Sequence, residues 1–351
     1  MNNGDWTVGG ILDVMIGVPD LTASIAYWEA FGYRVGRIGQ LEAPTAQALY
    51  GHASACRAVR MFHQSADHGL VRLVQWSESR GPGLGMAPFK VVGSRWSAAL
   101  VAKVARVYGH VKYAALAGAP LRIHQPDVVP APGTLREPFR HPISAAFEMA
   151  IAQPLYRQVL FERVDADHPL YGRINPGSLL QASQFTHCCV VTRGVARDGF
   201  DFYDRVLGLA RSGDFTIPWE EIGTSGRDIL ELERGQGFRL LKFDDARVRD
   251  GGPKRSGRLT IFDFAADSRQ DDLRDAAHPG ALGHTLYTLR LRDLDRAREA
   301  ARGAGATAVG AIVANEFGER SFTAVAPDGV MWAFVDAAGS HPLDPGGPGQ
   351  H

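Results

Sequence analysis

Residues 186 to 209 read THCCVVTRGVARDGFDFYDRVLGL. The apolar run in the first half is typical of a buried β-strand, in which the adjacent Cys188 and Cys189 point to opposite faces. The aromatic-rich second half predicts a helix that ends at Gly208. Further on, residues 227–234 and 238–244 are expected to pair as a hairpin, because Gly235 and Gly237 supply the permissive backbone of a tight turn.

This pattern of strand, helix and hairpin recurs along the chain, and an internal repeat of this kind strongly limits the possible folds. Three further copies are expected. In the first, strand 11–17 and helix 21–33 precede a hairpin of residues 55–64 and 70–76. In the second, strand 95–103 and helix 104–120 lead through a Pro-rich loop at 124–142 to a hairpin of residues 143–151 and 156–163. In the fourth, strand 284–293 precedes helix 293–306, with Asp293 as its N-cap, and a hairpin of residues 320–326 and 330–336.

The composition excludes several classes of function. The 38 basic and 38 acidic residues cancel, so we expect neither nucleic acid nor an anionic membrane as a partner. No apolar run approaches the ~20 residues of a membrane helix. The first residues do not resemble a secretory signal, and the three cysteines are odd in number, so a cytoplasmic protein with free thiols is predicted.

The four copies resemble the vicinal-oxygen-chelate superfamily of glyoxalases, bleomycin-resistance proteins and extradiol dioxygenases. The resemblance covers roughly residues 9 to 338 and is strongest over Thr186–Leu209. It implies an α+β fold in which four βαβββ modules form two curved mixed sheets, each enclosing a small-molecule cavity. We expect an N-terminal module pair at 9–165, a linker at 166–182, a C-terminal pair at 183–338 and a disordered tail at 339–351.

The resemblance also implies one metal ligand in each module, usually His, Gln or Glu on the first or fourth strand. Placed on this pattern, the first-strand positions hold Asp13, Trp96 or Ser97, His187 and Leu286. Only His187 is a usual ligand. His284 lies two residues before Leu286, on the same strand face.

The fourth-strand positions hold Arg72, Gln158, Arg239 and Ala333, without a carboxylate. Arginine repels a divalent cation and instead binds carboxylate, enolate or phenolate oxygens through forked hydrogen bonds. No cofactor is therefore predicted, and a divalent metal held by His187 and His284 is kept as an alternative.

Acid–base chemistry needs a group that titrates near neutrality and a cation or hydrogen-bond donor that stabilises an oxyanion. We predict His187 and Arg239 as the catalytic pair, with core packing as the other interpretation of His187. Asp13, Arg72, Gln158 and His284 are predicted to bind substrate. The alternative for Asp13 and Arg72 is a buried ion pair.

The leading hypothesis is an isomerase or lyase that transfers a proton on a carbonyl or phenolic small molecule. The first alternative is a ligand-sequestering protein of the resistance type. The second is a metal-dependent ring-cleaving dioxygenase or glyoxalase with displaced ligands. Strand tryptophans and phenylalanines favour an aromatic ligand, and a homodimer is left open.

Overall fold

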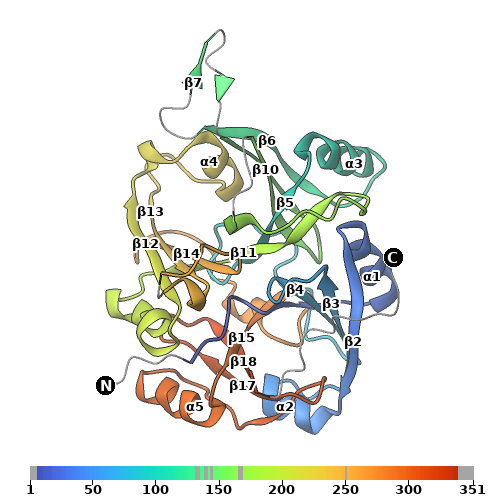
Figure 1. Cartoon of the computed structure of the whole chain (residues 1–351), viewed down its shortest axis with the longest axis vertical. Helices are drawn as coiled ribbons and strands as arrows, with labels where there is room; N and C mark the ends of the chain where they lie inside the picture. The colour runs from blue at the N-terminus through green and yellow to red at the C-terminus, as the bar shows by residue number, and fades with distance from the viewer. Residues whose placement is uncertain are drawn as a thin grey trace.

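The computed structural model describes residues 6–130, 135–137, 141–142, 145–164, 169–249 and 251–338. Two eight-stranded mixed sheets form the framework of this part of the chain. Figure 1 shows the sheet that contains β1 (the first sheet) in its lower half and the sheet that contains β5 (the second sheet) in its upper half. The predicted α+β fold of four modules in two curved sheets is confirmed. None of the described helices is long and apolar enough to cross a membrane.

Modules one and four form the first sheet. Module one consists of β1 (Asp13–Gly17), α1 (Leu21–Ala30), β2 (Tyr33–Leu41), α2 (Ala43–Tyr50), β3 (Cys56–His63) and β4 (Leu70–Trp76). Module four consists of β15 (Gly283–Leu291), α5 (Leu294–Gly303), β16 (Val313–Ala314), β17 (Arg320–Val325) and β18 (Met331–Asp336). The strand order is β16-β17-β18-β15-β1-β4-β3-β2, so the first strands of the two modules pair antiparallel at the centre.

Modules two and three form the second sheet. Module two consists of β5 (Arg95–Val101), α3 (Val104–Leu116), β6 (Arg122–Pro130), the short pair β7 (Leu135–Arg136) and β8 (His141–Pro142), β9 (Ala145–Ala152) and β10 (Arg157–Arg163). Module three consists of β11 (Ala182–Arg193), β12 (Ala210–Ile217), α4 (Thr224–Leu230), β13 (Phe238–Asp244) and β14 (Arg258–Phe264). Short helical turns in and around it are η1 (Pro169–Tyr171), η2 (Arg197–Phe200), η3 (Phe202–Val206), η4 (Trp219–Glu221), η5 (Ala246–Val248) and η6 (Arg274–Ala277). The order is β12-β13-β14-β11-β5-β10-β9-β6.

The expected pairing of consecutive modules, at 9–165 and 183–338, is wrong. Strand β1 pairs with β15, and β5 pairs with β11, so each sheet combines one module from each half of the chain. The first strands of all four modules are apolar, so the sequence does not indicate which of them pair with each other. The predicted linker lies between β10 and β11, with residues 165–168 outside the described part, and the predicted tail at 339–351 is also outside it.

Three local predictions differ from the structure. Residues 227–234 do not form a hairpin strand: the helix α4 occupies much of this stretch, with Ile229 and Leu230 buried, so β13 is the third strand of its module and β14 the fourth. The predicted loop at 124–142 contains most of strand β6. This strand tolerates Pro126 because it lies at the edge of the sheet, with an irregular register between His124 and Asp127.

The helix predicted at the end of residues 186–209 forms as two short turns instead. η2 is a 3₁₀ turn and η3 is a π-helical turn, and together they bury Phe200, Phe202 and Tyr203. The aromatic side chains therefore reach the core as the sequence predicts, although the backbone is not a regular α-helix.

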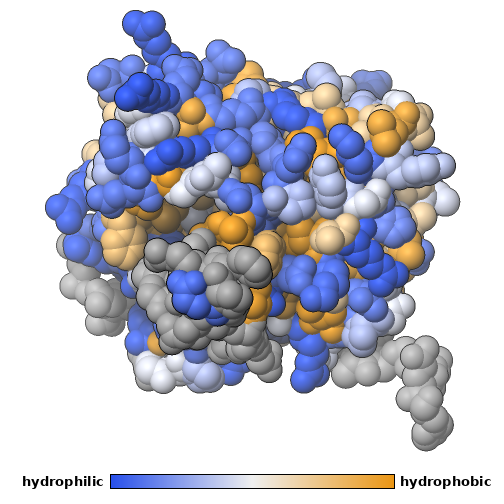
Figure 2. Space-filling model, turned by 90° about the horizontal axis from the view of Figure 1, so that it is seen from above, coloured by the Kyte–Doolittle hydropathy of each residue, from blue (hydrophilic) through white to orange (hydrophobic). Residues whose placement is uncertain are grey.

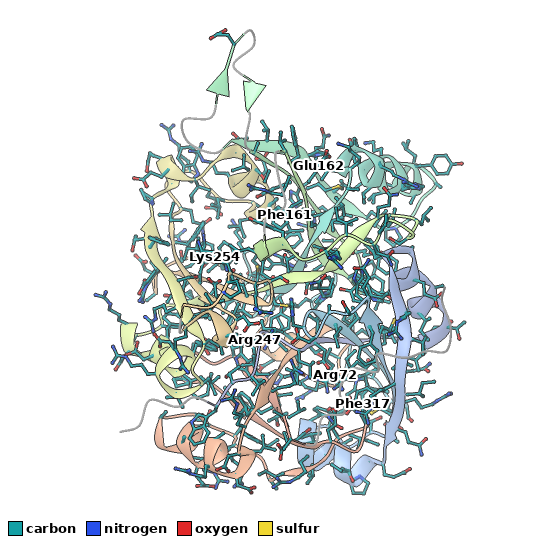
Figure 3. All side chains as sticks on the ribbon, in the orientation of Figure 1. Arg72, Phe161, Glu162, Arg247, Lys254 and Phe317 are labelled. Carbon is teal, nitrogen blue, oxygen red and sulfur yellow. The ribbon has the colours of Figure 1, made fainter. Side chains whose placement is uncertain are left out.

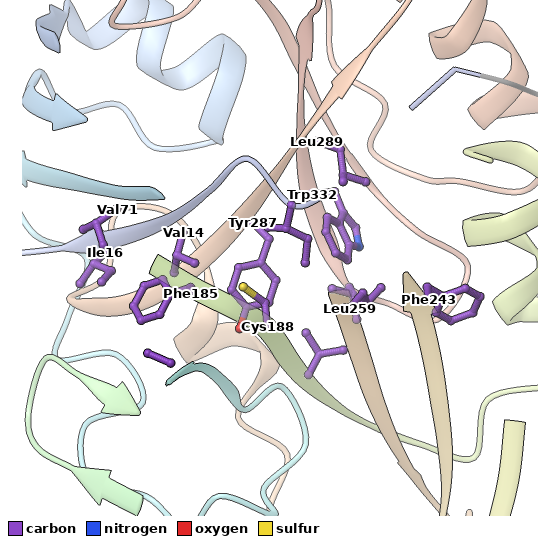
Figure 4. Packing of buried hydrophobic residues seen from close by; sticks show 14 of the residues in the cluster. Val14, Ile16, Val71, Phe185, Cys188, Phe243, Leu259, Tyr287, Leu289 and Trp332 are labelled. Atoms are coloured by element: carbon purple, nitrogen blue, oxygen red, sulfur yellow. The ribbon is translucent and has the colours of Figure 1, made fainter. Parts of the chain in front are cut away.

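A large hydrophobic core lies between the two sheets (Figure 4). Buried residues of α1, α3 and α5 also belong to it. Val14 of β1 and Cys188 of β11 contribute from opposite sheets. Tyr287 of β15 also links the sheets directly, because its hydroxyl donates to the carbonyl oxygens of Trp96 (2.9 Å) and Cys189 (2.8 Å). The two sheets therefore share one core and form a single unit.

Replacing Tyr287 with Phe keeps the ring but removes the hydroxyl that joins the sheets. We expect Tyr287→Phe to lower the free energy of unfolding by about 1 to 3 kcal/mol, because buried acceptors lose their donor. Tyr113→Phe, at an exposed position on α3, is the matched control and should change it by less than about 0.5 kcal/mol. Equal denaturant midpoints for the two variants would show that the hydroxyl does not join the sheets.

Candidate functional site

Each sheet has one face in the shared core and one face turned away from it, which we call the far face. Strand alternation places Asp13, Arg72 and Thr288 on the far face of the first sheet. It places His187 and Arg258 on the far face of the second sheet. The two far faces differ in charge and in exposure, and this difference locates the candidate site.

A closed network of six charged side chains fills the far face of the first sheet. Arg60 donates to Asp13 (2.9 Å) and, with two nitrogens, to Glu319 (2.8 and 3.0 Å). Arg72 donates to Glu316 (3.1 Å) and lies 3.3 Å from Asp13. Arg37 completes the set by donating to Glu319 (2.9 Å). Three arginines therefore balance three carboxylates.

Two uncharged side chains, Thr288 and Tyr50, add hydrogen bonds to the network around Arg72. Its guanidinium also donates to Thr288 Oγ1 (2.6 Å), and Tyr50 of α2 donates to Glu316 (2.7 Å). Arg72 is 1% exposed and Asp13 is 0% exposed. Figure 3 labels Arg72 and Phe317, which covers this face together with α2. The predicted substrate-binding residues Asp13 and Arg72 are thus brought together, but as a buried ion pair that no substrate reaches.

Loss of one partner from this network leaves buried carboxylates without their counterion. We expect Arg72→Met to lower the free energy of unfolding by about 3 to 5 kcal/mol. Arg302→Met removes an exposed ion pair with Glu299 and should cost no more than about 1 kcal/mol. Chemical denaturation of both variants measures the difference, and similar midpoints would contradict a closed, mutually compensated network.

The far face of the second sheet is partly exposed, and one of its cations has no ion-pair partner among the described residues. His187, Lys242 and Arg258 line it from β11, β13 and β14, and each is partly exposed. Arg258 forms a short ion pair with Asp244. Lys242 has no ion-pair partner among the residues that the structure describes. The local excess of positive charge favours an anionic ligand.

Aromatic and acidic groups surround these cations. The ring of His187 lies 5.3 Å from that of Phe161, labelled in Figure 3, and 6.2 Å from that of Tyr171. Tyr171 also packs under the guanidinium of Arg163, at 5.4 Å. Burial raises the pKa of Tyr171. The positive charges of Arg163 and Arg258 lower it, and the negative charge of Glu148 raises it. The ring of Tyr171 thus lies near side chains of β9, β10, β11 and β14, and we call this group the far-face cluster.

The electrostatics of His187 follow from this setting. Burial lowers the pKa of His187 to about 3, and the positive charges of Arg258 and Lys242 contribute to the shift. The imidazole is neutral at physiological pH. Its Nδ1 is hydrogen-bonded to Thr186 Oγ1 (2.9 Å), whereas Nε2 has no partner among the described residues. His187 can therefore offer Nε2 to a ligand as an acceptor or, in the other tautomer, as a donor.

Glu148 is the acidic group of the cluster. Burial raises the pKa of Glu148, and a hydrogen bond from Ser225 Oγ (3.1 Å) only partly offsets this. Glu148 lies on β9, on the same face as Phe161, and a carboxyl group with a raised pKa can donate a proton closer to neutrality than an ordinary glutamate.

Arg239 is not part of this cluster. It lies on the opposite face of β13 from Lys242, three residues away with a regular register to β14. There it forms a bidentate ion pair with Asp214 (2.7 and 2.8 Å) and stacks over Phe200. The predicted pair of His187 and Arg239 is therefore not assembled. The error arose from treating β13 as the fourth strand of module three.

The register of the parallel pairs identifies the true fourth-strand residue. In the first sheet, the residue two positions after Asp13 pairs with Arg72. In module three, the residue two positions after His187 pairs with Thr260. Threonine is not a usual ligand for a divalent metal, so the fourth strands supply Arg72, Thr260 and Ala333 without a carboxylate.

Gln158 and His284 lie far from the far-face cluster. Gln158 is fully buried and accepts a hydrogen bond from Tyr27 of α1. His284 is also buried, and the backbone of Leu155 lies close to its ring. Burial lowers the pKa of His284 to about 3, with Arg157 and Arg95 adding to the shift. The structure therefore places both residues in the interior rather than on an accessible surface.

The residues present do not fit the metal implied by the fold. His187 and His284 belong to different sheets, and cations rather than carboxylates surround His187. Within the described ranges, no three His, Cys, Asp or Glu side chains come close enough to hold a metal ion. Lys242 and Arg258 would repel a divalent cation at this position.

Sequence reasoning identified His187 but not Lys242 or Arg258, because their place depends on which strand pairs with β11. Figure 2 views the molecule from the end that carries α3 and α4, where apolar side chains reach the surface among polar ones. Phe262 and Leu240 are among the partly buried residues packed on the far face of the second sheet. The site thus combines cations with apolar and aromatic surface.

Comparison with solved structures gives similar folds at low sequence identity. A mutant of glyoxalase I from Zea mays is 14% identical with a TM-score of 0.53, covering 93% of this chain and 94% of that one. A putative dioxygenase from Bacillus subtilis is 12% identical with a TM-score of 0.54, covering 94% of this chain and 86% of that one. No family model matches the sequence, and no curated protein matches it. The likeness is one of fold.

The lowered pKa of His187 has a measurable effect on stability. The ordinary pKa of histidine is about 6.5, so between about pH 6.5 and pH 3 His187 binds a proton in the unfolded chain but not in the folded chain. His187 therefore makes the protein less stable as the pH falls through this range. NMR titration of the ring should give a pKa near 3 in the wild type and a higher value in Lys242→Met, because one repelling charge is gone. An ordinary pKa in the wild type, unchanged by Lys242→Met, would contradict the described environment.

Proposed function

We propose, from the premise that the chain has the vicinal-oxygen-chelate fold, that it is a small-molecule enzyme of the isomerase or lyase type. The substrate is an anionic carbonyl or phenolic compound with an aromatic part, bound on the far face of the second sheet. The supporting observation is the partly exposed group of Lys242, Arg258 and neutral His187, in which Lys242 lacks a counterion among the described residues.

In this proposal Lys242 and Arg258 hold the negative charge of the substrate. A bound anion offsets the repulsion from both cations and so raises the pKa of His187 above its value in the free protein, while burial, the larger cause of the lowered pKa, continues to act. The imidazole becomes a stronger base only when substrate is present. Nε2 then accepts a proton from the carbon or oxygen next to the carbonyl, while the cations stabilise the resulting enolate.

Glu148 is the second proton-transferring group in the proposal. Its raised pKa keeps a share of the carboxyl protonated closer to neutrality than a surface glutamate. It can return a proton to the opposite side of the intermediate. Phe161 and Tyr171 supply the apolar wall against which an aromatic ring packs.

Proton abstraction can be tested without knowledge of the product by hydrogen exchange in D₂O. We expect the protein to accelerate deuterium incorporation next to the carbonyl of phenylpyruvate, chosen as an aromatic 2-oxo acid, as followed by NMR. His187→Gln should slow the enzymatic rate by roughly 100- to 10,000-fold, because the general base is lost. Lys242→Met should mainly raise KM, since it removes a contact with the anion.

His110→Gln, at an exposed position on α3, is the matched control and should exchange at the wild-type rate. Tight binding of phenylpyruvate without accelerated exchange would favour the ligand-sequestering function instead. Exchange that EDTA abolishes would favour a metal-dependent enzyme. Unchanged exchange in His187→Gln would remove His187 from the proposed mechanism.

A further inference from the structure

Arg95 and Arg157 are buried guanidinium groups without a counterion. Their exposed fractions are 5% and 1%, and neither forms an ion pair with any residue in the described part of the chain. Arg95 stacks over the ring of Tyr287 (5.3 Å) and Arg157 over that of Phe89 (4.5 Å), contacts that compensate a buried charge only in part. The remaining stabilisation of each buried charge must come from hydrogen-bond partners or from a bound ion. The two side chains meet this need to different extents.

Neutral acceptors surround Arg157. Its guanidinium donates to the carbonyl oxygens of Ala87 (2.6 Å) and Pro88 (3.1 Å) and to Ser94 Oγ (2.9 Å). Arg95 has only one such contact, from Nη2 to the carbonyl oxygen at the start of β18 (3.1 Å). Its Nε and Nη1 are buried and have no hydrogen bond to any residue that the structure describes, whereas Arg157 lacks such a partner only at Nε. Arg95 is therefore the cation with more unused donors.

Arg95 lines a small void that lies beside a larger pocket. The void has a volume of about 20 Å³ and is also lined by His278 and Asp328. A pocket of about 500 Å³ shares Arg274, Asp328 and Gly329 with it and adds Arg193 at its wall. The pocket lies next to the residues that join the two sheets, since Tyr203 of the shared core donates to Asp328 (2.6 Å).

The void and the pocket together are lined by three arginines, Arg95, Arg193 and Arg274, and by two aspartates, Asp198 and Asp328. Asp272 forms ion pairs with Arg274 (2.6 Å) and Arg193 (3.8 Å), and Arg193 also donates to two backbone carbonyl oxygens. Asp198 at the wall is exposed. Asp328 already accepts from the Tyr203 hydroxyl and from a backbone N–H two residues on (3.0 Å), and burial raises its pKa to about 6. The negative charge of Asp328 acts on Arg95, but among the described residues no hydrogen bond joins the two side chains, so the free donors of Arg95 stay available.

We propose that this pocket is a second anion site, which binds the carboxylate or phosphate group of a small molecule. Arg95 is the inner partner of the anion, and Arg193 and Arg274 are its outer partners. The remaining volume of the pocket accommodates the organic part of the ligand. This site is separate from the far face of the second sheet and does not depend on the proposed proton transfer.

The test is a titration with inorganic phosphate and, separately, with sodium acetate, at ionic strength held constant with sodium chloride. The ring signals of His278, which lines the void, report binding by NMR. We expect a saturable shift, and we expect Arg95→Met to weaken the apparent affinity by at least about tenfold, the effect of losing a charge-assisted hydrogen bond. Lys242→Met should leave the titration unchanged, because Lys242 belongs to the other site.

Tighter binding of phosphate would identify a phosphate ester as the ligand class, and tighter binding of acetate a carboxylate; both support the proposal. Arg274→Met, at a half-exposed position, provides a second variant that should weaken binding severalfold if Arg95→Met does not fold. Absence of a saturable shift with either probe would overturn the proposal. A shift that Arg95→Met and Arg274→Met leave intact would overturn it as well.

Discussion

A charge that leaves water must find a partner, and this constraint separates the two far faces of the protein. In the first sheet, Arg37, Arg60 and Arg72 meet Asp13, Glu316 and Glu319, and the set is neutral and closed. In the second sheet, Lys242 has no such partner in the described part of the chain. The fold offers two equivalent surfaces, but the chain has used its own carboxylates to fill one of them. In our proposal the other surface binds a ligand.

The pairing of first strands determines which residues meet at that surface. Because β5 pairs with β11, residues of modules two and three line a single far face, and Phe161 comes to lie beside His187. The same arrangement brings the two ends of the chain into the first sheet, where β1 pairs with β15. Tyr287 then holds the sheets together from within the shared core. Architecture and site thus depend on the same two strand pairs.

The sequence predicts the modules well and their assembly poorly. Apolar periodicity and turn residues locate the hairpins β3–β4, β9–β10 and β17–β18, because these features are local. Residues 227–234 alternate enough to suggest a strand, yet residues 227–230 belong to α4, since burial of Ile229 and Leu230 favours the helix. That error moved the fourth strand of module three from β14 to β13. It also decided which site residues were found: His187 lies on the first strand of the clearest module, whereas Lys242 and Arg258 required the register between β13 and β14.

The far face of the second sheet should be open to anions, while that of the first sheet is closed. Anomalous diffraction from crystals soaked in sodium bromide tests this difference most directly. We predict a bromide peak beside the amine of Lys242, within reach of Arg258 and His187, and none among Arg60, Arg72 and Glu316. A bromide in the first sheet's network, with the surroundings of Lys242 empty, would contradict this assignment of the two faces.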